Sequence, residues 1–202
     1  MAAALELYAE AGWSGFNFDV VARRAGIGKA PLYLRWSSKE DLLLDAFRIR
    51  VEAIPLRDTG DLRSDLVAYA CHLLKDKAGP QGWAFLRIHV EATVTPELYA
   101  DFSRQVVDPH VAGASDLLAR GVERGELPAG TTPSLLLDGI YGAIIVRMIL
   151  TPPEQRARLA AHPQVYAEII VDLVLAGARG LAATQDGLAA PLYPDRARRP
   201  QP

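Results

Sequence analysis

The stretch NFDVVARRAGIGKAPLYLRW, at residues 17–36, predicts two short helices joined by a tight turn. Asn17 is a good N-cap, and the aspartate two residues later then lies in the positive first turn of a helix. The apolar residues that follow recur at i, i+3, i+4 and i+7 and form one stripe: Phe18, Val21, Ala22 and Ala25. Gly26 then supplies the turn. This pattern is typical of a helix-turn-helix motif.

The second helix of the motif is expected at residues 29–36, with Pro31 in its first turn, where proline is tolerated. One side of this segment is expected to be buried against the first helix, through Ile27, Leu32 and Trp36. The opposite side is then free to face the major groove of DNA: Lys29, Ala30, Pro31, Tyr33 and Leu34.

Helical spacing continues on both sides of the motif. The first helix of the chain is expected to end at Gly12. A fourth helix is capped by Ser37 or Ser38 and extends to about Ile54. Further helices, separated by glycines and by prolines such as Pro109, are expected at 61–77, 82–94, 96–107, 109–125, 134–150 and 163–182. No alternating strand pattern exceeds a few residues, so the sequence predicts an all-α protein.

The composition excludes several classes of protein. Of the 202 residues 50% are hydrophobic and 23% are charged, so the chain can bury a core and is not wholly disordered. A net charge of −2 excludes a uniformly basic coat for nucleic acid, but residues 12–39 carry five basic side chains against one acidic side chain. The lone Cys71 cannot form an internal disulfide, and no Cys/His cluster has the spacing of a zinc site.

Neither targeting nor membrane insertion is expected. Glu6 and Glu10 interrupt the apolar residues of the first helix, which lacks the basic start of a signal peptide. The longest apolar run, near residues 135–150, contains an aspartate and an arginine, which favours a buried helix over a membrane span. We therefore expect a soluble, cytoplasmic protein.

Three pieces of the sequence stand in the order and at the spacing of the tetracycline-repressor (TetR/AcrR) family of bacterial regulators: LELYAEAGW at 5–13, VARRAGIGKAPLY at 21–33 and SKEDLLLDAF at 38–47. The first quarter of the chain closely resembles this family, and the rest is similar in helical layout. The resemblance implies an N-terminal three-helix helix-turn-helix domain followed by an antiparallel helical bundle. The implied divisions are a DNA-binding domain at 1–47 and an effector-binding and dimerisation domain at 48–183, and the composition of residues 184–202, rich in proline and arginine, predicts a flexible tail.

The resemblance also implies roles for particular residues. Four residues stand where such proteins read base edges: Lys29, Ala30, Pro31 and Leu34. Three residues stand where proteins of this family contact phosphates: Tyr33, Arg35 and Lys39. Asn17 stands at a helix start that abuts the DNA backbone, and the free N–H groups there suit an anion. The chemistry fits these roles, because lysine and arginine pair with phosphate and tyrosine can donate its hydroxyl.

This chain departs from the family pattern at several positions. Gly28 and Pro31 stand where the family often has hydroxyl side chains, which removes two polar contacts, whereas Leu34 can press against a thymine methyl group. Phe16 replaces a residue that is commonly small or hydroxylated. The resemblance places Met1 inside the first helix, so either the natural start lies upstream or DNA affinity is reduced. The residues leave both alternatives open.

The second part of the chain is expected to bind an effector and a second copy. Five residues are candidates for lining an effector pocket: Trp83, Leu86, His89, Tyr141 and Arg147. The alternative is that they are ordinary core or surface residues. Arg147 lies in an apolar helix and needs a partner, for which Glu91, Asp138, Asp172 or an anionic ligand would serve. The resemblance implies a homodimer through the apolar helices at about 134–150 and 163–182.

Together these features predict a ligand-responsive transcriptional regulator, namely a repressor that a small apolar effector releases from a palindromic double-stranded DNA operator. No catalytic motif, metal site or cofactor is expected, so the protein is not predicted to be an enzyme. One alternative is an all-α small-molecule-binding protein or enzyme that has lost DNA binding. Another is a helical protein whose last helices bind a different partner.

Overall fold

The computed structural model describes residues 1–52, 56–91 and 94–182, and all regular structure in these ranges is helical. The elements, in chain order, are α1 (Ala2–Gly15), α2 (Phe18–Ala25), α3 (Ala30–Arg35), α4 (Lys39–Glu52), α5 (Leu62–Ala78), α6 (Gly82–Glu91), α7 (Pro96–Phe102), a π-helical turn η1 (Ser103–Val107), α8 (Asp108–Glu123), α9 (Pro133–Leu150), α10 (Pro153–Ala161) and α11 (Gln164–Ala182). The prediction of an all-α fold is confirmed. The predicted end of the fourth helix near Ile54 and the predicted tail at 184–202 lie outside the described residues.

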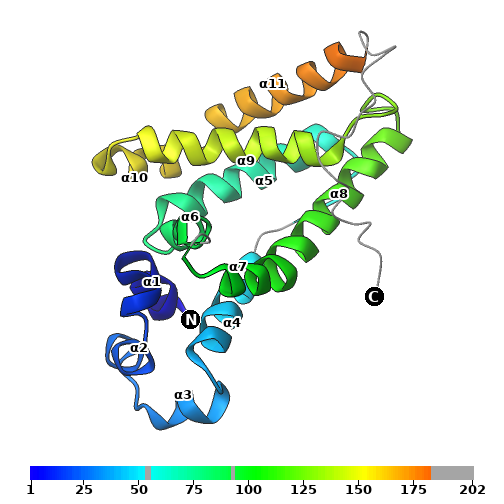
Figure 1. Cartoon of the computed structure of the whole chain (residues 1–202). Coiled ribbons are helices and arrows are strands. Elements are labelled where there is room, and N and C mark those ends of the chain that lie inside the picture. Colours follow the sequence, from blue (N-terminus) through cyan, green and yellow to red (C-terminus); the bar gives the residue numbers. More distant parts are fainter. Residues whose placement is uncertain (53–55, 92–93, 183–202) are drawn as a thin grey trace, which may run out of the picture.

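Helices α1 to α4 form the lower part of the molecule in Figure 1, with α3 at its end. The aromatic centre of this part is Tyr8, whose ring meets Phe16 at 6.1 Å and Phe47 at 5.9 Å, both edge-on. Phe47 also contacts Phe85 of α6 and Phe102 of α7 at 4.8 Å each. The core of the N-terminal helices therefore continues into α6 and α7.

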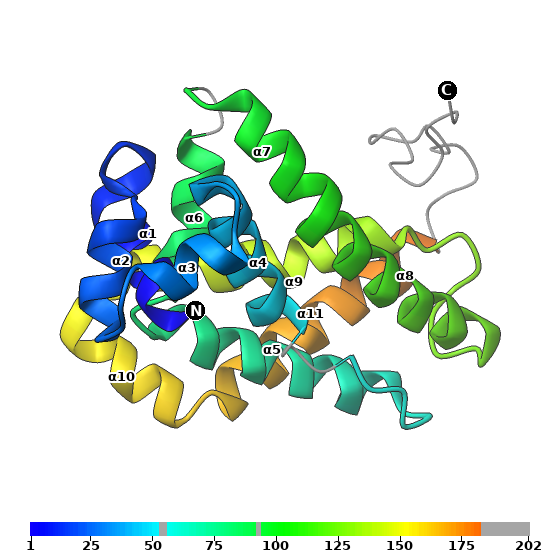
Figure 2. The same ribbon diagram turned by 90° about the horizontal axis from the view of Figure 1, so that it is seen from below.

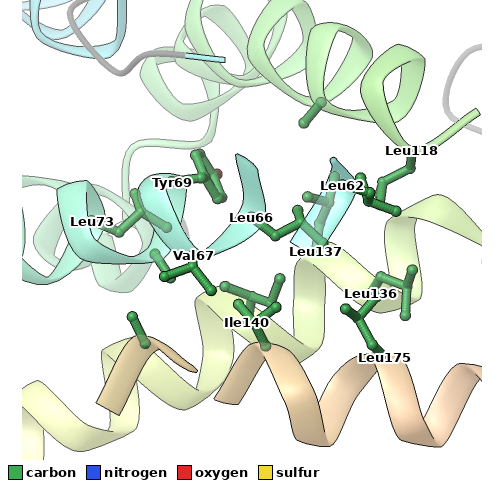
Figure 3. Close-up of a cluster of buried hydrophobic side chains, with 14 of the residues drawn as sticks. Leu62, Leu66, Val67, Tyr69, Leu73, Leu118, Leu136, Leu137, Ile140 and Leu175 are labelled. Carbon is green, nitrogen blue, oxygen red and sulfur yellow. The ribbon is translucent and has the colours of Figure 1, made fainter. Parts of the chain in front are cut away.

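A second core lies between α5, α8, α9 and α11 (Figure 3). Helix α11 buries one stripe along its length at helical spacing, through Ala167, Val171, Leu175 and Ala178. Leu175 points toward Leu136 of α9, and Leu137 of α9 points toward α5 in the same view. Figure 1 shows α9 and α11 side by side along the upper face of the molecule.

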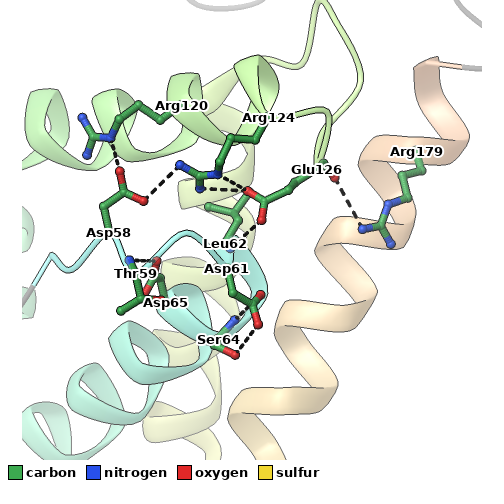
Figure 4. Close-up of polar contacts among 10 residues, drawn as sticks. All are labelled: Asp58, Thr59, Asp61, Leu62, Ser64, Asp65, Arg120, Arg124, Glu126 and Arg179. Carbon is green, nitrogen blue, oxygen red and sulfur yellow. Dashed lines mark hydrogen bonds and ion pairs between the residues drawn. The ribbon is translucent and has the colours of Figure 1, made fainter.

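Polar contacts fix the start of α5 against α8 and α11 (Figure 4). Asp58 pairs with Arg120 at 2.5 Å and with Arg124 at 3.1 Å, both from α8. Glu126 accepts a hydrogen bond from the backbone N–H of Leu62 at 3.1 Å and pairs with Arg124 at 2.8 Å. These contacts close the end of the bundle that lies farthest from α6.

Helix α9 is the one straight helix in the described ranges that is long and apolar enough to cross a membrane, with a mean hydropathy of 1.6. Helices α10 and α11 meet the same criteria only as a pair bent by 76°. In this chain α9 packs against α5, α8 and α11, and its residues Ile140, Ile144 and Met148 belong to the core. This packing is that of a bundle helix with one face left open.

Several predicted boundaries are wrong. Helix α1 does not end at Gly12: the chain kinks there, with φ +66°, and helix resumes to Gly15. Pro109 does not separate two helices, because η1 widens the backbone just before it and α7, η1 and α8 follow one another without a break. Residues 153–161, expected only as part of a connection, form α10.

Candidate nucleic-acid interface

The helix-turn-helix predicted at residues 17–36 forms from local interactions. The Asn17 side chain accepts a hydrogen bond from the backbone N–H of Val20 at 3.0 Å, which caps α2. Helix α2 ends at Gly26, whose φ of +67° is the left-handed conformation that favours glycine. The N–H of Ile27 bonds back to the carbonyl of Ala22 at 3.0 Å and closes the turn.

Helix α3 is held by few contacts. Leu32 is its one buried residue, and the half-buried Trp36 that follows donates its indole N–H to Asp45 of α4 at 3.2 Å. The prediction that Ile27 is buried beside them is wrong, since 48% of its surface is exposed. Ile27 lies in the turn rather than in a helix, so helical spacing does not set the direction of its side chain.

The outer side of α3 is open to solvent, as predicted. Leu34 is 88% exposed and Tyr33 is 59% exposed, which is unusual for large apolar and aromatic side chains without a partner. Ala30 and Pro31 are exposed on the same short helix. Helix α3 projects at the end of the molecule in Figure 1 and faces the viewer in Figure 2, so no other part of the described chain covers it.

Three of the predicted DNA-binding residues meet at one open cleft of about 510 Å³. The cleft is lined by Asn17, Phe18, Asp19, Tyr33 and Lys39. The rings of Phe18 and Tyr33 lie 4.7 Å apart, which fixes the tyrosine over the start of α2. The first backbone N–H groups of a helix lack partners within it, so the cleft combines such groups with a phenol and an ammonium.

Lys39 is held in place by Trp13 of α1. Its ammonium lies 3.7 Å above the ring of Trp13 and donates to the Trp13 carbonyl at 3.0 Å. Two of its three N–H donors therefore remain for another acceptor. A phosphate in the cleft would meet this ammonium and the positive end of α2 together.

Two other predicted DNA-binding residues, Lys29 and Arg35, have acidic partners that sequence reasoning missed. Lys29 pairs with Asp19 at 2.5 Å, and both side chains are about half exposed. Arg35 lies 3.7 Å from Asp45, and its guanidinium lies 4.8 Å from the ring of Trp36. The Lys29–Asp19 pair is exposed enough to exchange for a phosphate, because surface ion pairs are weak in water. In the other pair the Arg35 side chain is 64% exposed and can turn toward DNA, whereas Asp45 is 15% exposed and keeps Arg48 and Trp36 as partners.

A polar joint links the N-terminal helices to α6. The Glu91 carboxylate accepts hydrogen bonds from the Tyr8 hydroxyl at 2.8 Å and from the Trp13 N–H at 3.1 Å, and it pairs with Arg87 at 3.0 Å. Arg87 donates in turn to the carbonyls of Ala9 and Glu10 at 3.1 and 3.0 Å. Burial, followed by the bond to Glu91, raises the pKa of Tyr8, so this hydroxyl remains a donor.

The joint depends on Gly12. A Cβ atom at this position would lie 2.2 Å from Oε1 of Glu91 and 2.4 Å from the Arg87 guanidinium. The kink in α1 therefore makes room for the two side chains of α6. This explains why the chain has glycine at a point where helical spacing alone predicts the end of a helix.

The five predicted effector-binding residues do not form one site. Trp83 and Leu86 line a small pocket of about 10 Å³ together with Lys77. Tyr141 is near this pocket, with its ring centre 5.8 Å from the Lys77 ammonium. His89 and Arg147 lie elsewhere.

His89 is exposed on α6 and packs on the aromatic rings of α7, with its ring 5.4 Å from that of Tyr99. Arg147 is exposed and lies 4.9 Å over the ring of Tyr166 in α11. Two of the three acidic partners considered for Arg147 are engaged elsewhere: Glu91 pairs with Arg87, and Asp172 pairs with Arg63 at 2.6 Å. Because its guanidinium is exposed, Arg147 does not need a buried partner.

Sequence reasoning also missed the buried polar groups of the bundle. Asp76 and Lys77 are 5% and 3% exposed, and Arg50 of α4 reaches Asp76 at 2.5 Å. The Tyr69 hydroxyl lies 3.1 Å from Nε2 of His110. Burial raises the pKa of Tyr69 to about 12 and lowers the pKa of His110. Adjacent opposite charges near the end of a helix are typical of a solvated surface, so no pattern in the sequence indicates that Asp76 and Lys77 are buried.

The fold and the interface define a helix-turn-helix DNA-binding protein, in which a helical bundle lies behind helices α1 to α4, here called the reading head. The family profile described as "Bacterial regulatory proteins, tetR family" matches residues 1–46. The profile described as "Tetracyclin repressor-like, C-terminal domain" matches residues 56–174. The chain belongs to the TetR family of bacterial transcriptional regulators, as its N-terminal motifs predicted.

Known relatives agree with this assignment. The HTH-type transcriptional regulator YdeS of Bacillus subtilis is 27% identical over 185 residues, which are 91% of this chain and 88% of the relative. The HTH-type transcriptional regulator AqdR of Rhodococcus erythropolis is 34% identical over 137 residues, which are 67% of this chain and 65% of AqdR. The crystal structure of the TetR family transcription regulator SCO0332 superimposes with a TM-score of 0.62 at 26% identity, over 87% of this chain and 93% of that protein. These relatives are regulators rather than enzymes, and the chain is a DNA-binding transcriptional regulator.

Proposed function

We propose that the protein is a dimeric, effector-responsive repressor that works in the cytoplasm. Each copy inserts α3 into a major groove of a palindromic operator, with the DNA-binding domain at residues 1–47 and the effector-binding and dimerisation domain at 48–183. The proposed DNA contacts are Asn17, Lys29, Ala30, Pro31, Tyr33, Leu34, Arg35 and Lys39.

The observation that carries the proposal is the uncovered outer side of α3 beside the cleft at the start of α2. Tyr33 and Leu34 are exposed there, and no contact within the described residues requires this exposure. In the proposed complex Leu34 contacts a thymine methyl group, and the phosphate beside it sits between Tyr33, Lys39 and the N–H groups of α2. Lys29 and Arg35 exchange their carboxylate partners for DNA.

A second copy is proposed to cover the open faces of α9 and α11. On α11 the residues opposite the buried stripe are apolar and exposed at i, i+4 and i+8: Val165 at 67%, Ile169 at 58% and Leu173 at 67%. On α9, Val146 is 54% exposed and Leu150 is 75% exposed. Exposed apolar side chains on two neighbouring helices support a protein interface, and a two-fold dimer matches a palindromic operator.

The effector is proposed to act through α6 and α4. Helix α6 carries Trp83 and Leu86 toward the pocket, and it carries Arg87 and Glu91 toward α1. A molecule that enters the pocket must displace Trp83 and Leu86. This displacement moves Arg87 and Glu91 on the same helix and, through their contacts with α1, the reading head. The effector then weakens DNA binding by as much as its affinities for the two arrangements differ.

The proposal is tested with a duplex selected from a random pool, using the full chain in a gel-shift titration at several salt concentrations. Lys39→Ala is expected to weaken binding about tenfold and to lower the salt slope by about 1, because one phosphate contact is lost. Tyr33→Ala is expected to weaken binding with the salt slope unchanged, since its hydroxyl carries no charge.

Lys75→Ala is the matched control, because Lys75 is an exposed lysine on α5, away from the head. Wild-type binding and slope in both head variants would refute the assigned contacts. A wild-type chain with no salt-dependent DNA retention would instead favour the alternative of an all-α small-molecule-binding protein or enzyme without DNA binding.

A further inference from the structure

Three charged side chains meet at the edge of the interior near the ends of α4 and α5: two of them, Asp76 and Lys77, are buried, and Arg50 is 33% exposed. Lys77 is 3% exposed, and its ammonium lies 2.8 Å from Asp76, which is 5% exposed. Arg50, near the end of α4, places its Nε atom 2.5 Å from the other oxygen of Asp76. One carboxylate on α5 therefore serves two cations, one from its own helix and one from the helix that carries the reading head.

This cluster has an excess of positive charge. Among the residues that the structure describes, Asp76 is the one carboxylate in contact with either cation. The other buried acid of α5, Asp65, is engaged by the backbone N–H and hydroxyl of Thr59 at 2.8 and 2.9 Å. Nε of Arg50 is buried and has no aligned hydrogen-bond acceptor in the described ranges, despite its closeness to Asp76. The Arg50 side chain is 33% exposed, whereas Lys77 is almost wholly buried, so an anion that reaches these two cations would be stabilised by both.

Lys77 also forms one wall of an apolar pocket. The rest of the wall consists of Gly82, Trp83, Leu86, Ile145, Met148 and Ile149. The Lys77 ammonium also lies 3.8 Å from the ring centre of Phe85 in α6. The pocket holds about 10 Å³, which is room for a single water molecule, so a larger ligand must part Trp83 and Leu86, which are only half buried.

We propose that the bundle binds an amphipathic carboxylic acid, with its carboxylate on Lys77 and Arg50 and its apolar tail among Trp83, Leu86 and Met148. The inference rests on the proposed effector response and specifies the ligand class, which the sequence alone predicted only as small and apolar. A charge-assisted contact supplies the anion that the cluster lacks, and few convergent polar groups in an apolar site are typical of ligand pockets.

The position of Arg50 gives this ligand a direct route to the DNA-binding head. A second carboxylate beside Arg50 competes with Asp76 for its guanidinium and so changes how the end of α4 is tied to α5. The tail acts on α6 at the same time. One molecule thereby moves both helices that connect the bundle to the head.

The test uses octanoate and 1-octanol as probes in titration calorimetry with the full chain, below the micelle-forming concentration of octanoate. The two probes have the same tail, so the difference between them reports the carboxylate. Octanoate is expected to bind wild type at least tenfold more tightly than octanol, as a hydrogen-bonded charge pair implies. Lys77→Met is expected to reduce that ratio to about two or less, while Lys75→Met, two residues away and exposed, leaves it unchanged.

Arg50→Gln is a second variant that keeps the Lys77–Asp76 pair, and it decides the matter if Lys77→Met does not fold. It is expected to lower the octanoate affinity about tenfold with little change for octanol. Equal binding of the two probes by wild type, no binding of either, or an unchanged ratio in the folded variants would overturn the inference. Salt-dependent DNA binding is measured on the same samples: if it persists, only the ligand class is wrong, whereas its absence in wild type refutes the proposed function itself.

Discussion

Glu91→Gln tests the joint between the reading head and the bundle. The wild-type carboxylate accepts hydrogen bonds from Tyr8 at 2.8 Å and Trp13 at 3.1 Å, and it pairs with Arg87 at 3.0 Å. Glutamine has nearly the same shape but one acceptor oxygen, and its amide nitrogen cannot accept from Tyr8 or from the backbone. The substitution therefore removes the charge and leaves one of the donors without a partner.

The size of the effect follows from these contacts. A hydrogen bond to a charged group contributes about 1.5–3 kcal/mol, and the 20% exposure of the Glu91 side chain reduces that value somewhat. We expect the free energy of unfolding to fall by about 2 kcal/mol, which corresponds to a decrease of roughly 1 M in the urea midpoint for a chain of this size.

The assay is urea unfolding followed by circular dichroism, with Glu123→Gln as the control, because Glu123 is an exposed glutamate at the end of α8. The control is expected to unfold with wild type. If Glu91→Gln matches wild type within about 0.5 kcal/mol, a smaller loss than one charged hydrogen bond, the joint does not hold the head to α6.

Three further perturbations test other parts of the structure. Gly82→Ala puts a Cβ atom 2.5 Å from the backbone at the end of α5, so thermal unfolding should occur several degrees lower, while Gly79→Ala, whose Cβ atom would meet nothing closer than 3.4 Å, should not lower it. Asp19→Asn frees Lys29 and removes a negative charge near the DNA, so affinity for duplex at low salt should rise about two- to tenfold in a gel shift. Burial lowers the pKa of His110 below 6.5, so the contribution of this neutral imidazole to stability is complete above pH 6.5 and is lost as the pH falls through the folded-state pKa. Wild type should therefore lose more free energy of unfolding between pH 7 and pH 5 than the His110→Gln variant does.

The parts of the fold that the sequence predicted correctly depend on short-range interactions. The Asn17 cap and the left-handed Gly26 turn are fixed by residues within a few positions of each other, so the helix-turn-helix could be located from its local sequence. The same holds for the exposure of Tyr33 and Leu34, because a six-residue helix with one buried leucine has little else to bury.

The parts that the sequence did not predict depend on contacts between distant segments. The kink at Gly12 accommodates side chains from α6, about 75 to 79 positions away, and no local pattern reveals them. Arg50 and Asp76 meet because the long Arg50 side chain reaches from the end of α4 to the end of α5, 26 positions along the chain, so the cluster became visible in three dimensions alone. Arg147 was expected to need a partner, but the side of α9 that carries it is open in this chain.

Hydroxyl-radical footprinting of the full chain on a selected duplex tests the central claim that two copies present α3 to one operator. We expect two protected patches of equal strength, related by two-fold symmetry and centred about 10–10.5 base pairs apart or at a multiple of that distance. A single protected patch, or even protection along the whole duplex, would contradict it.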